Sequence, residues 1–288
     1  MIPTQFDYKA PATLDEAVAL LASDLDGAKV LAGGHSLIPA MKLRLAQPQL
    51  LVDIARIKSL SYIREDGDQI LIGATTTHYQ LESSDLLKTI CPLLPACAAS
   101  IGDVQVRNKG TIGGSIAHSD PAGDWPAAVL ALDADLVLVG ATGERTVKAE
   151  DFFVDLLTTD LQPGEILREI RIKKPGGRFG HAYQKVPHPA SGFAVVGVAV
   201  QLVLNDDGSC ESAAIGITGV GVKAYRAKAV EAALGGSNLD DNALAGAVTH
   251  VCDGVDPNAD LYASSDYRCH LAQVHTRRAI QAAKARVK

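Results

Sequence analysis

The sequence predicts an α+β fold in two domains, and three observations along the chain predict it. Strand and helix patterns are interspersed over residues 1–177. The cluster Lys173-Lys174-Pro175-Gly176-Gly177 then interrupts the pattern in the manner of a linker. Beyond it, a hairpin pattern is followed by three helical patterns. We therefore expect a first domain in two lobes, about residues 1–55 and 56–177, and a smaller domain of antiparallel strands and a helix bundle over residues 178–288.

The first lobe is expected to contain two helices and two strands. Thr13-Leu14-Asp15-Glu16 is a capping box, which satisfies free N–H groups at the start of a helix. Ser36 is the candidate N-cap of the second helix, which must end before Pro48. In chain order we expect a helix from residue 14 to Gly27, a strand over residues 29–32, a helix over residues 36–45 and a strand over residues 49–54.

The second lobe is expected to mix short helices with strands and one long loop. Pro92 and Pro95 divide residues 77–102 into short helical pieces. Residues 104–124 are rich in Gly, Asn, Ser and Asp, which predicts an ordered loop. The rest of the pattern predicts a strand over residues 69–74, a helix over residues 125–134, a hairpin over residues 136–147 and a strand over residues 166–172.

The second domain is expected to begin with antiparallel strands and to end with helices. The turn Asn205-Asp206-Asp207-Gly208 joins strand patterns over residues 193–204 and 212–218. Three helical patterns follow, over residues 225–234, 242–252 and 265–287.

The composition argues against several classes of function. Lys and Arg total 27 against 33 Asp and Glu, so the formal charge of −6 provides no basic field for a nucleic acid or an anionic membrane. No apolar run reaches the ~18 residues of a membrane span. The first residues also lack the basic and apolar regions of a signal peptide. We expect a cytoplasmic protein that holds any anionic ligand with local donors.

The cysteines and histidines do not predict a metal site. The five cysteines form no C-x-x-C pair, and the eight histidines show no H-x-x-x-H or H-x-H spacing. We therefore expect no iron–sulfur cluster or zinc in this chain, and buried free thiols in a reducing cytoplasm. The cysteines are Cys91, Cys97, Cys210, Cys252 and Cys269.

Two glycine loops carry the chemistry that the sequence predicts. The first glycine loop, Leu31-Ala32-Gly33-Gly34-His35-Ser36-Leu37, lies between a strand and a helix, and the second is Gly110-Thr111-Ile112-Gly113-Gly114-Ser115. Neither matches G-x-x-x-x-G-K-[ST], which excludes an ordinary P-loop. Paired glycines let oxygens approach the backbone, hydroxyls add donors, and a helix N-terminus favours an anion. We predict that the two loops hold one diphosphate between them.

Simpler interpretations of the glycine patterns remain open. Either Gly-Gly pair alone is equally consistent with a tight turn. Gly219-Val220-Gly221-Val222-Lys223-Ala224 matches G-x-G-x-x-A, follows a strand, and precedes Asp240 and Asp241 by about twenty residues, as in a dinucleotide site. No return strand follows, because the pattern after Tyr225 is helical. We therefore favour a turn between hairpin and helix at this segment.

Taken together, the two glycine loops resemble the paired FAD-binding motifs of the medium subunits in the carbon monoxide dehydrogenase and xanthine dehydrogenase family of molybdenum hydroxylases. The matching motifs are Ala32-Gly33-Gly34-His35-Ser36 and Thr111-Ile112-Gly113-Gly114. The resemblance covers essentially the whole chain. It extends to Leu51-Val52-Asp53-Ile54, Val106-Arg107-Asn108-Lys109-Gly110, His118-Ser119-Asp120-Pro121, Pro163-Gly164-Glu165-Ile166-Leu167 and Ala182-Tyr183-Gln184-Lys185.

The resemblance implies a two-lobed FAD-binding domain of the vanillyl-alcohol-oxidase type, followed by the C-terminal domain of these flavoproteins. The residues from Leu31 to Leu37 would wrap the pyrophosphate, with the second glycine loop on its other side. The resemblance also implies a cofactor contact for Asp124, and it places Leu167 and Lys185 beside the isoalloxazine ring. An ammonium there would stabilise the charge gained on reduction. The alternatives are a solvated Lys185 and an Asp124 that caps its own loop.

The family's chemistry implies electron transfer within a larger complex. A large subunit with a molybdenum–pterin cofactor oxidises the substrate, and two [2Fe–2S] clusters on a small subunit pass the electrons to FAD. The FAD reduces an external acceptor, which could be a quinone, a haem protein or NAD. The complex is a dimer of heterotrimers, which could lie at the inner face of the membrane. This chain would then contain no catalytic residue for the organic substrate and no metal.

Three questions of function stay open at this point. The substrate is selected by another chain, and Ala-Gly-Gly-His-Ser favours carbon monoxide over aldehydes, N-heterocycles and xanthine. A stand-alone FAD oxidoreductase is the first alternative, although the tail after Gly180 is short for an added substrate domain. A non-catalytic FAD-binding assembly protein is the second alternative.

Overall fold

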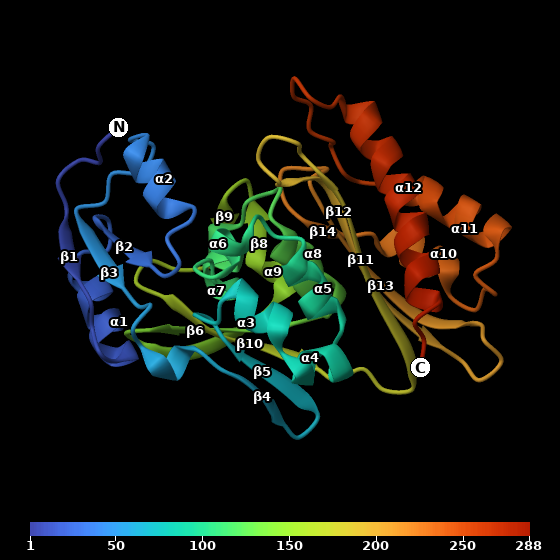
Figure 1. Ribbon diagram of the computed structural model, residues 1–288, viewed down its shortest axis with the longest axis horizontal. Coiled ribbons are helices and arrows are strands. Elements are labelled where there is room, and N and C mark those ends of the chain that lie inside the picture. The colour runs from blue at the N-terminus through green and yellow to red at the C-terminus, as the bar shows by residue number, and fades with distance from the viewer.

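The computed structural model describes residues 1–288 and has three parts, arranged side by side in Figure 1. A small lobe at the N-terminus, drawn in blue, lies at one end of the molecule. A central lobe, drawn in teal to yellow-green, lies between it and the C-terminal part, which is drawn in gold to red. Because the central lobe contacts both of the others, it can form sites with either.

The N-terminal lobe is a three-stranded parallel sheet in the order β1-β3-β2. The first helix of this lobe packs one face against Val52, through the side chains of Ala17, Val18 and Leu21. Thr13 caps this helix by accepting a hydrogen bond from the Glu16 N–H at 3.2 Å. The elements are β1 (Asp7–Lys9), α1 (Leu14–Ser23), β2 (Ala28–Leu31), α2 (Leu37–Lys42), β3 (Leu50–Asp53) and the short 3₁₀ helix η1 (Lys58–Leu60).

The central lobe is built on a five-stranded antiparallel sheet in the order β4-β5-β10-β6-β7. Its core includes the fully buried Trp125 and Phe152, which lie between this sheet and the helices. The strands are β4 (Ile63–Asp66), β5 (Gln69–Gly73), β6 (Asp135–Gly140), β7 (Gly143–Lys148) and β10 (Ile166–Lys173), with the separate pair β8 (Phe153–Asp155) and β9 (Thr158–Thr159). The helices are α3 (His78–Ser83), α4 (Asp85–Ile90), α5 (Leu93–Ala99), α6 (Val104–Arg107), α7 (Ile112–His118), α8 (Asp124–Ala131) and α9 (Ala149–Phe152).

The C-terminal part is a four-stranded antiparallel sheet in the order β11-β12-β13-β14, covered on one side by helices. Its long helix α12 packs along β11 and β12 (Figure 1). Helix α8 of the central lobe packs on β13, where a Cβ at Gly216 would lie 2.9 Å from the Ala127 carbonyl carbon. Gly216 therefore permits this close contact. The elements are β11 (Arg178–Pro187), β12 (Ala194–Leu204), β13 (Cys210–Thr218), β14 (Tyr225–Arg226), α10 (Lys228–Leu234), α11 (Asp241–Ala247), η2 (Val248–His250) and α12 (Ser265–Lys284).

The predicted α+β class is confirmed, but two local predictions are wrong. Residues 104–124, expected to be a loop, contain α6 and α7, because Asp103 and Thr111 act as N-caps that outweigh the glycine content. Residues 225–226, expected to begin a helix, form β14, which pairs with β13. The second difference arises because strand pairing with a distant segment is a tertiary contact that helical periodicity does not report.

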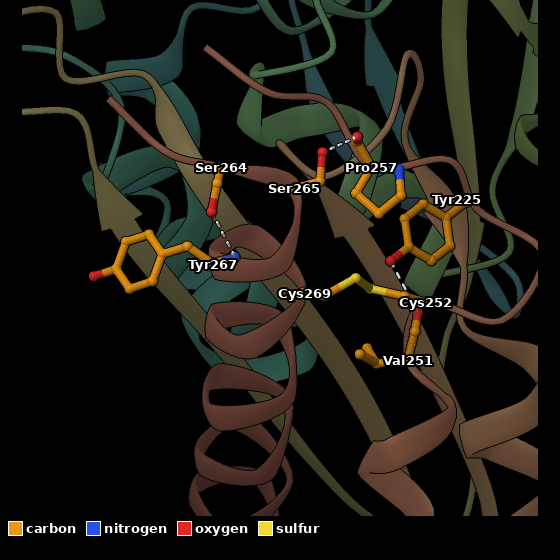
Figure 2. The surroundings of a disulfide bond; sticks show 8 residues. All are labelled: Tyr225, Val251, Cys252, Pro257, Ser264, Ser265, Tyr267 and Cys269. Carbon is orange, nitrogen blue, oxygen red and sulfur yellow. Dashed lines mark hydrogen bonds between the residues drawn. A yellow bond between two sulfur atoms is a disulfide. The ribbon is translucent and has the colours of Figure 1, made fainter. Parts of the chain in front are cut away.

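The expectation of five free thiols is also wrong for two of the cysteines. Cys252 and Cys269 form a disulfide that joins the segment after η2 to α12, with a Cα–Cα distance of 6.1 Å (Figure 2). Beside it, the Tyr225 hydroxyl donates to the Val251 carbonyl at 2.9 Å (Figure 2). The 17-residue separation gave no signal of this pair, because only the packing of α12 brings the two residues together. The other three cysteines are free and buried.

No helix of the chain combines the length with the apolar character that a bilayer crossing requires.

Candidate flavin site

A cavity of about 890 Å³ lies between the N-terminal lobe and the central lobe. This volume falls within the range of sites for large organic ligands. Both glycine loops line it, together with Leu25 and Asp26 from the first lobe and Gln162 and Gly164 from the second. The predicted residues that line it are Leu31, Ala32, Gly33, Gly34, His35, Ser36, Leu37, Gly110, Thr111, Gly113, Gly114, Ser115, Asp124 and Leu167.

The two glycine loops touch each other at one end of this cavity. A Cβ atom on Gly33 would lie 2.8 Å from the Cα of Gly110 and even closer to the Lys109 carbonyl oxygen. A Cβ on Gly114 would lie 3.8 Å from the Cβ of Ala32. Gly33 is therefore required by close contact between two backbones, in addition to any access that it gives to a ligand. Segments far apart in sequence thus form one wall.

The first glycine loop presents unpaired backbone donors to the cavity. None of the N–H groups of residues 33–37 donates to another group of the protein, and the next N–H, of Ile38, donates to the Gly34 carbonyl at 3.0 Å. Gly34 has φ +78°, a left-handed conformation that glycine adopts without cost. Successive N–H groups in such a turn, followed by a helix, form a concavity that suits an anion.

The second glycine loop differs, because all of its backbone N–H groups except that of Thr111 are already occupied. Gly113 donates to the Ala74 carbonyl at 2.9 Å, and Gly114 donates to the Thr111 hydroxyl oxygen at 3.2 Å. Ile112 likewise donates to the Thr76 carbonyl at 3.0 Å. This loop therefore offers a small, close surface, hydroxyl groups and a single free backbone N–H, in place of the run of backbone donors that the sequence pattern predicted.

Two serine hydroxyls at the cavity have no protein partner. Ser36 was predicted to cap α2, but its side chain makes no capping hydrogen bond. Its hydroxyl, like that of Ser115 in the second glycine loop, lies in the cavity wall. Both hydroxyls are therefore available to a ligand, one from each loop.

At another part of the wall, Asp124 forms a buried cluster with Tyr183 and Lys185. The Lys185 ammonium lies 2.9 Å from one Asp124 carboxylate oxygen and 3.0 Å from the Ser100 carbonyl. The Tyr183 hydroxyl donates to the other Asp124 oxygen at 2.5 Å. Burial raises the pKa of Asp124, and the Lys185 charge acts against that rise. The cluster joins α5, α8 and β11, which are distant in the sequence.

This arrangement corrects the expected environment of Lys185. The side chains of Lys185 and Asp124 are only 6% and 5% exposed, so a solvated lysine does not fit. A loop-capping aspartate does not fit either, because the Asp124 carboxylate accepts from Tyr183 and Lys185 and from no backbone N–H. Asp124 and Leu167 line the cavity, whereas Lys185 lies behind Asp124 and does not. The positive charge is thus paired within the protein, because a buried ammonium without a carboxylate is strongly disfavoured.

His78 is a cavity residue that the sequence reasoning missed. The backbone N–H of His78 donates to the Gly110 carbonyl at 3.0 Å. The Nδ1 atom of its ring accepts a hydrogen bond from the Trp125 indole N–H at 3.0 Å. Burial is the main cause that lowers the pKa of His78 to about 4. The capping box of Thr77 and Gln80 could have placed His78 at a helix start, but not its contact with the second glycine loop.

The competing G-x-G-x-x-A pattern forms a turn between two antiparallel strands. Gly219 has φ +87°, and its N–H donates to the Pro121 carbonyl at 2.7 Å. The buried Arg268 guanidinium donates to the carbonyls of Gly219 at 2.7 Å and Val195 at 2.8 Å. The chain then enters β14, so no βαβ unit exists and a dinucleotide site of that type is excluded.

Two protein families match this chain and together span nearly all of it. The family described as the FAD binding domain in molybdopterin dehydrogenase matches residues 4–175. The family described as the CO dehydrogenase flavoprotein C-terminal domain matches residues 181–283.

Individual relatives match over their full length. The carbon monoxide dehydrogenase medium chain of Hydrogenophaga pseudoflava is 42% identical over 99% of both chains, and that of Afipia carboxidovorans is 41% identical over 100% of both. Among solved structures, carbon monoxide dehydrogenase from H. pseudoflava has a TM-score of 0.97 at 43% identity over 100% of both chains. Quinoline 2-oxidoreductase from Pseudomonas putida 86 has a TM-score of 0.92 at 32% identity over 99% of both chains. The chain therefore belongs to the family of FAD-binding oxidoreductase subunits formed by the medium chains of carbon monoxide dehydrogenase and related molybdenum hydroxylases.

Proposed function

We propose that this chain binds FAD in the cavity between its first two lobes and transfers electrons within a molybdenum hydroxylase complex. The observation that carries the proposal is the run of unpaired N–H groups over residues 33–37, packed directly against the second glycine loop. Such backbone donors suit the diphosphate of a ligand. Neither loop contains a lysine, so the backbone N–H groups have to bind this anion.

The residues of the cavity fit the different parts of FAD. The first glycine loop would hold the pyrophosphate with its N–H groups, and the Ser36 and Ser115 hydroxyls would add donors from both sides. Gly33 and Gly34 keep side chains out of this part of the wall, and Gly113 lets α7 pack against Ala74, the residue directly after β5. None of these contacts needs a positively charged side chain, which agrees with the net negative charge of the chain.

The buried cluster would form the wall beside the isoalloxazine ring. We propose that Asp124 and Leu167 contact the ring, and that Lys185 acts through Asp124 by fixing its carboxylate. Bound FAD supplies the chemistry of exchanging electrons singly with one partner and in pairs with another. The protein's part is to exclude water there and to fix the charges that face the ring.

The partners proposed for this chain follow from its relatives. Those named above are chains of multi-subunit enzymes, and the H. pseudoflava structure is of an enzyme that lacks the Mo-pyranopterin moiety of its molybdenum cofactor. We propose an iron–sulfur small subunit with two [2Fe–2S] clusters as electron donor, and a molybdenum–pterin large subunit, in a dimer of heterotrimers. A quinone, a haem protein or NAD would accept the electrons, in the cytoplasm or at the inner face of the membrane.

Carbon monoxide is the substrate that we favour for the complex. The two carbon monoxide dehydrogenase medium chains are 41–42% identical to this chain. Medium chains of complexes that act on other substrates are less similar, including 36% for a glyceraldehyde dehydrogenase and 33% for a caffeine dehydrogenase. Aldehyde, N-heterocycle and xanthine dehydrogenases remain the alternatives.

Co-purification tests the proposal directly. The tagged chain, expressed in its native host, should retain FAD and bring down two partners that contain molybdenum and iron in the ratio of one molybdenum to two [2Fe–2S] clusters. Carbon monoxide, an aldehyde, quinoline and xanthine should then be compared as reductants of the bound flavin. Reduction by one of them only in the presence of both partners is expected.

A stand-alone FAD oxidoreductase is the competing function, and the same experiment separates it. The chain purified alone with FAD should show no turnover with any of these substrates. Full turnover by the isolated chain would overturn the subunit proposal, while a flavin-free chain that still binds both partners would overturn its FAD part.

A further inference from the structure

The His78 imidazole lies where the two glycine loops meet. Its side chain lines the cavity, although His78 is only 5% exposed. A Cβ on Gly110 would lie 2.6 Å from His78 Nε2, which shows that this nitrogen is the ring atom that faces the second glycine loop. Gly110 in turn lies against Gly33 of the first glycine loop, because a Cβ on Gly33 would be 2.8 Å from the Gly110 Cα. The ring therefore lies where the second loop meets the first.

The hydrogen bond with Trp125 fixes the tautomer of this histidine. The indole Nε1–H can only donate, and it lies 3.0 Å from His78 Nδ1. Nδ1 must therefore be the unprotonated acceptor, and a neutral ring then carries its single hydrogen on Nε2. Burial, with the charges of His35 and Arg107, lowers the pKa of His78 to about 4, so the ring is neutral near pH 7.

The remaining Nε2–H has no acceptor within the protein. Of the two ring nitrogens, only Nδ1 takes part in a hydrogen bond with another residue. The neighbouring backbone groups on the first glycine loop, the N–H groups of residues 33–37, are donors as well. Nε2 is not among the fully buried polar atoms without a partner, so it keeps accessible surface in a residue that lines the cavity. A ligand in the cavity can therefore supply the acceptor that the protein does not.

We propose that His78 donates a hydrogen bond from Nε2 to a pyrophosphate oxygen of FAD, with Trp125 as the positioning residue that fixes the tautomer. The inference rests on the proposed FAD site and adds to it a neutral donor from α3. A neutral imidazole suits this place because it binds the phosphate without introducing a charge that would depend on pH. The acceptor is the pyrophosphate, and not the flavin ring, because Nε2 lies at the junction of the two glycine loops.

Two substitutions separate the donor from the Trp125 contact. In His78→Asn, the amide oxygen replaces Nδ1 as the acceptor for Trp125, but nothing replaces Nε2–H. In His78→Gln, the longer amide places an N–H near the position of Nε2. FAD affinity is measured by quenching of FAD fluorescence during titration into the full-length chain after removal of flavin. We expect His78→Asn to weaken FAD binding about 10- to 100-fold, as for loss of a hydrogen bond to a charged group, and His78→Gln to restore most of the loss.

A second measurement on the unsubstituted protein covers the case in which the variants do not fold. With ¹⁵N-labelled histidine, His78 should show hydrogen on Nε2 alone between pH 6 and 8, and a coupling from Nε2 to a pyrophosphate phosphorus once FAD is bound. A proton on Nδ1, or equal affinity of wild type and His78→Asn, would overturn the inference. Equal weakening by both substitutions would also overturn it, since His78 would then be only structural. Failure of the wild-type chain to bind FAD would instead overturn the proposed function.

Discussion

At the scale of single residues, the cavity wall depends on polar groups that are buried in pairs. Asp124 with Lys185 and His78 with Trp125 each place one polar group at the cavity and one behind it. The rear partner determines the charge or the tautomer of the group in front. Such pairs make the wall sensitive to substitutions at positions that do not touch a ligand.

Replacement of Lys185 by Met should therefore affect stability before it affects redox chemistry. The substitution leaves the buried Asp124 carboxylate without its cation, which typically costs about 3–5 kcal/mol of unfolding free energy. Urea denaturation of the flavin-free chain measures this cost. The double variant Lys185→Met/Asp124→Asn removes the uncompensated charge and should recover most of the stability. A stable Lys185→Met single variant would contradict the buried pair.

His78 predicts a specific dependence of stability on pH. In the unfolded chain it binds a proton near its ordinary pKa of 6.5, whereas in the folded chain it does so only near 4. Between pH 6.5 and 4, unfolding is accompanied by uptake of a proton at His78. The contribution of His78 to the unfolding free energy is therefore fully present above about pH 7 and decreases as the pH falls toward 4. The total decrease is about 3 kcal/mol. Denaturation at several pH values should show a shallower fall for His78→Asn than for wild type. Parallel curves would contradict a low pKa of His78.

At the scale of elements, the site is formed by the contact between two loops, one from the N-terminal lobe and one from the central lobe. The first glycine loop leaves β2, and the second leads into α7. The first turn of α7 is held by hydrogen bonds to Ala74 and Thr76 in the segment directly after β5. Neither loop forms the wall alone. The contact of Gly33 with Gly110 is where the two elements meet most closely.

Substitution of Gly33 should consequently separate the loops. In Gly33→Val, the new side chain meets the Lys109 and Gly110 backbone, which cannot move as a flexible side chain could. We expect loss of measurable FAD binding and a drop in unfolding free energy of about 1–3 kcal/mol. Gly246→Ala is the matched control, because no atom lies within 4 Å of its Cβ and its helix α11 is remote from the cavity. Stoichiometric FAD in Gly33→Val would contradict the loop contact as the basis of the site.

The disulfide is an element-scale feature with its own test. Cys252–Cys269 closes a 17-residue separation between the segment after η2 and α12 (Figure 2). A cross-link of this length contributes about 3 kcal/mol by restricting the unfolded chain. Alkylation under denaturing, non-reducing conditions should modify three cysteines, and reduction should expose all five. If the Cys252→Ala/Cys269→Ala variant has the same unfolding free energy as wild type, the disulfide does not stabilise the fold.

At the scale of the whole molecule, the cavity lies between lobes that have separate cores. The N-terminal lobe has its own cluster around Val52, and the central lobe has a larger one around Trp125. Residues from both lobes line the cavity, so a ligand there contacts both at once. The C-terminal part adds Ser191, Gly192 and Phe193 to the lining, and it places Tyr183 and Lys185 behind the wall, through β11.

FAD should therefore stabilise the folded chain as a bridge between lobes. At free FAD of 100 times its Kd, the linkage relation gives about 2.7 kcal/mol of added unfolding free energy. Thermal unfolding of the flavin-free chain should shift to higher temperature on addition of FAD. AMP, which lacks the pyrophosphate and the flavin, should produce a much smaller shift at the same concentration. Equal shifts with both would indicate that the glycine loops do not contribute to binding.

The sequence by itself determined the class of the fold, most of its elements and the two glycine loops. These features depend on local signals, namely side-chain periodicity, caps, and glycines that permit unusual backbone, which act within a few residues. The resemblance carried by the loops also led to the family to which the chain belongs. Local glycine content misled at α6 and α7, where capping residues competed with it. It also misled at the second glycine loop, where most of the predicted backbone donors are occupied.

The tertiary structure alone decided which groups in the wall remain free and which are occupied. It left the N–H groups of residues 33–37 unpaired while it used most of those of the second glycine loop, and it placed Lys185 behind Asp124. It also paired two cysteines and brought His78 to Gly110. The physical reason is that hydrogen-bond satisfaction and burial are set by partners from distant segments, and no local pattern records which partners will meet.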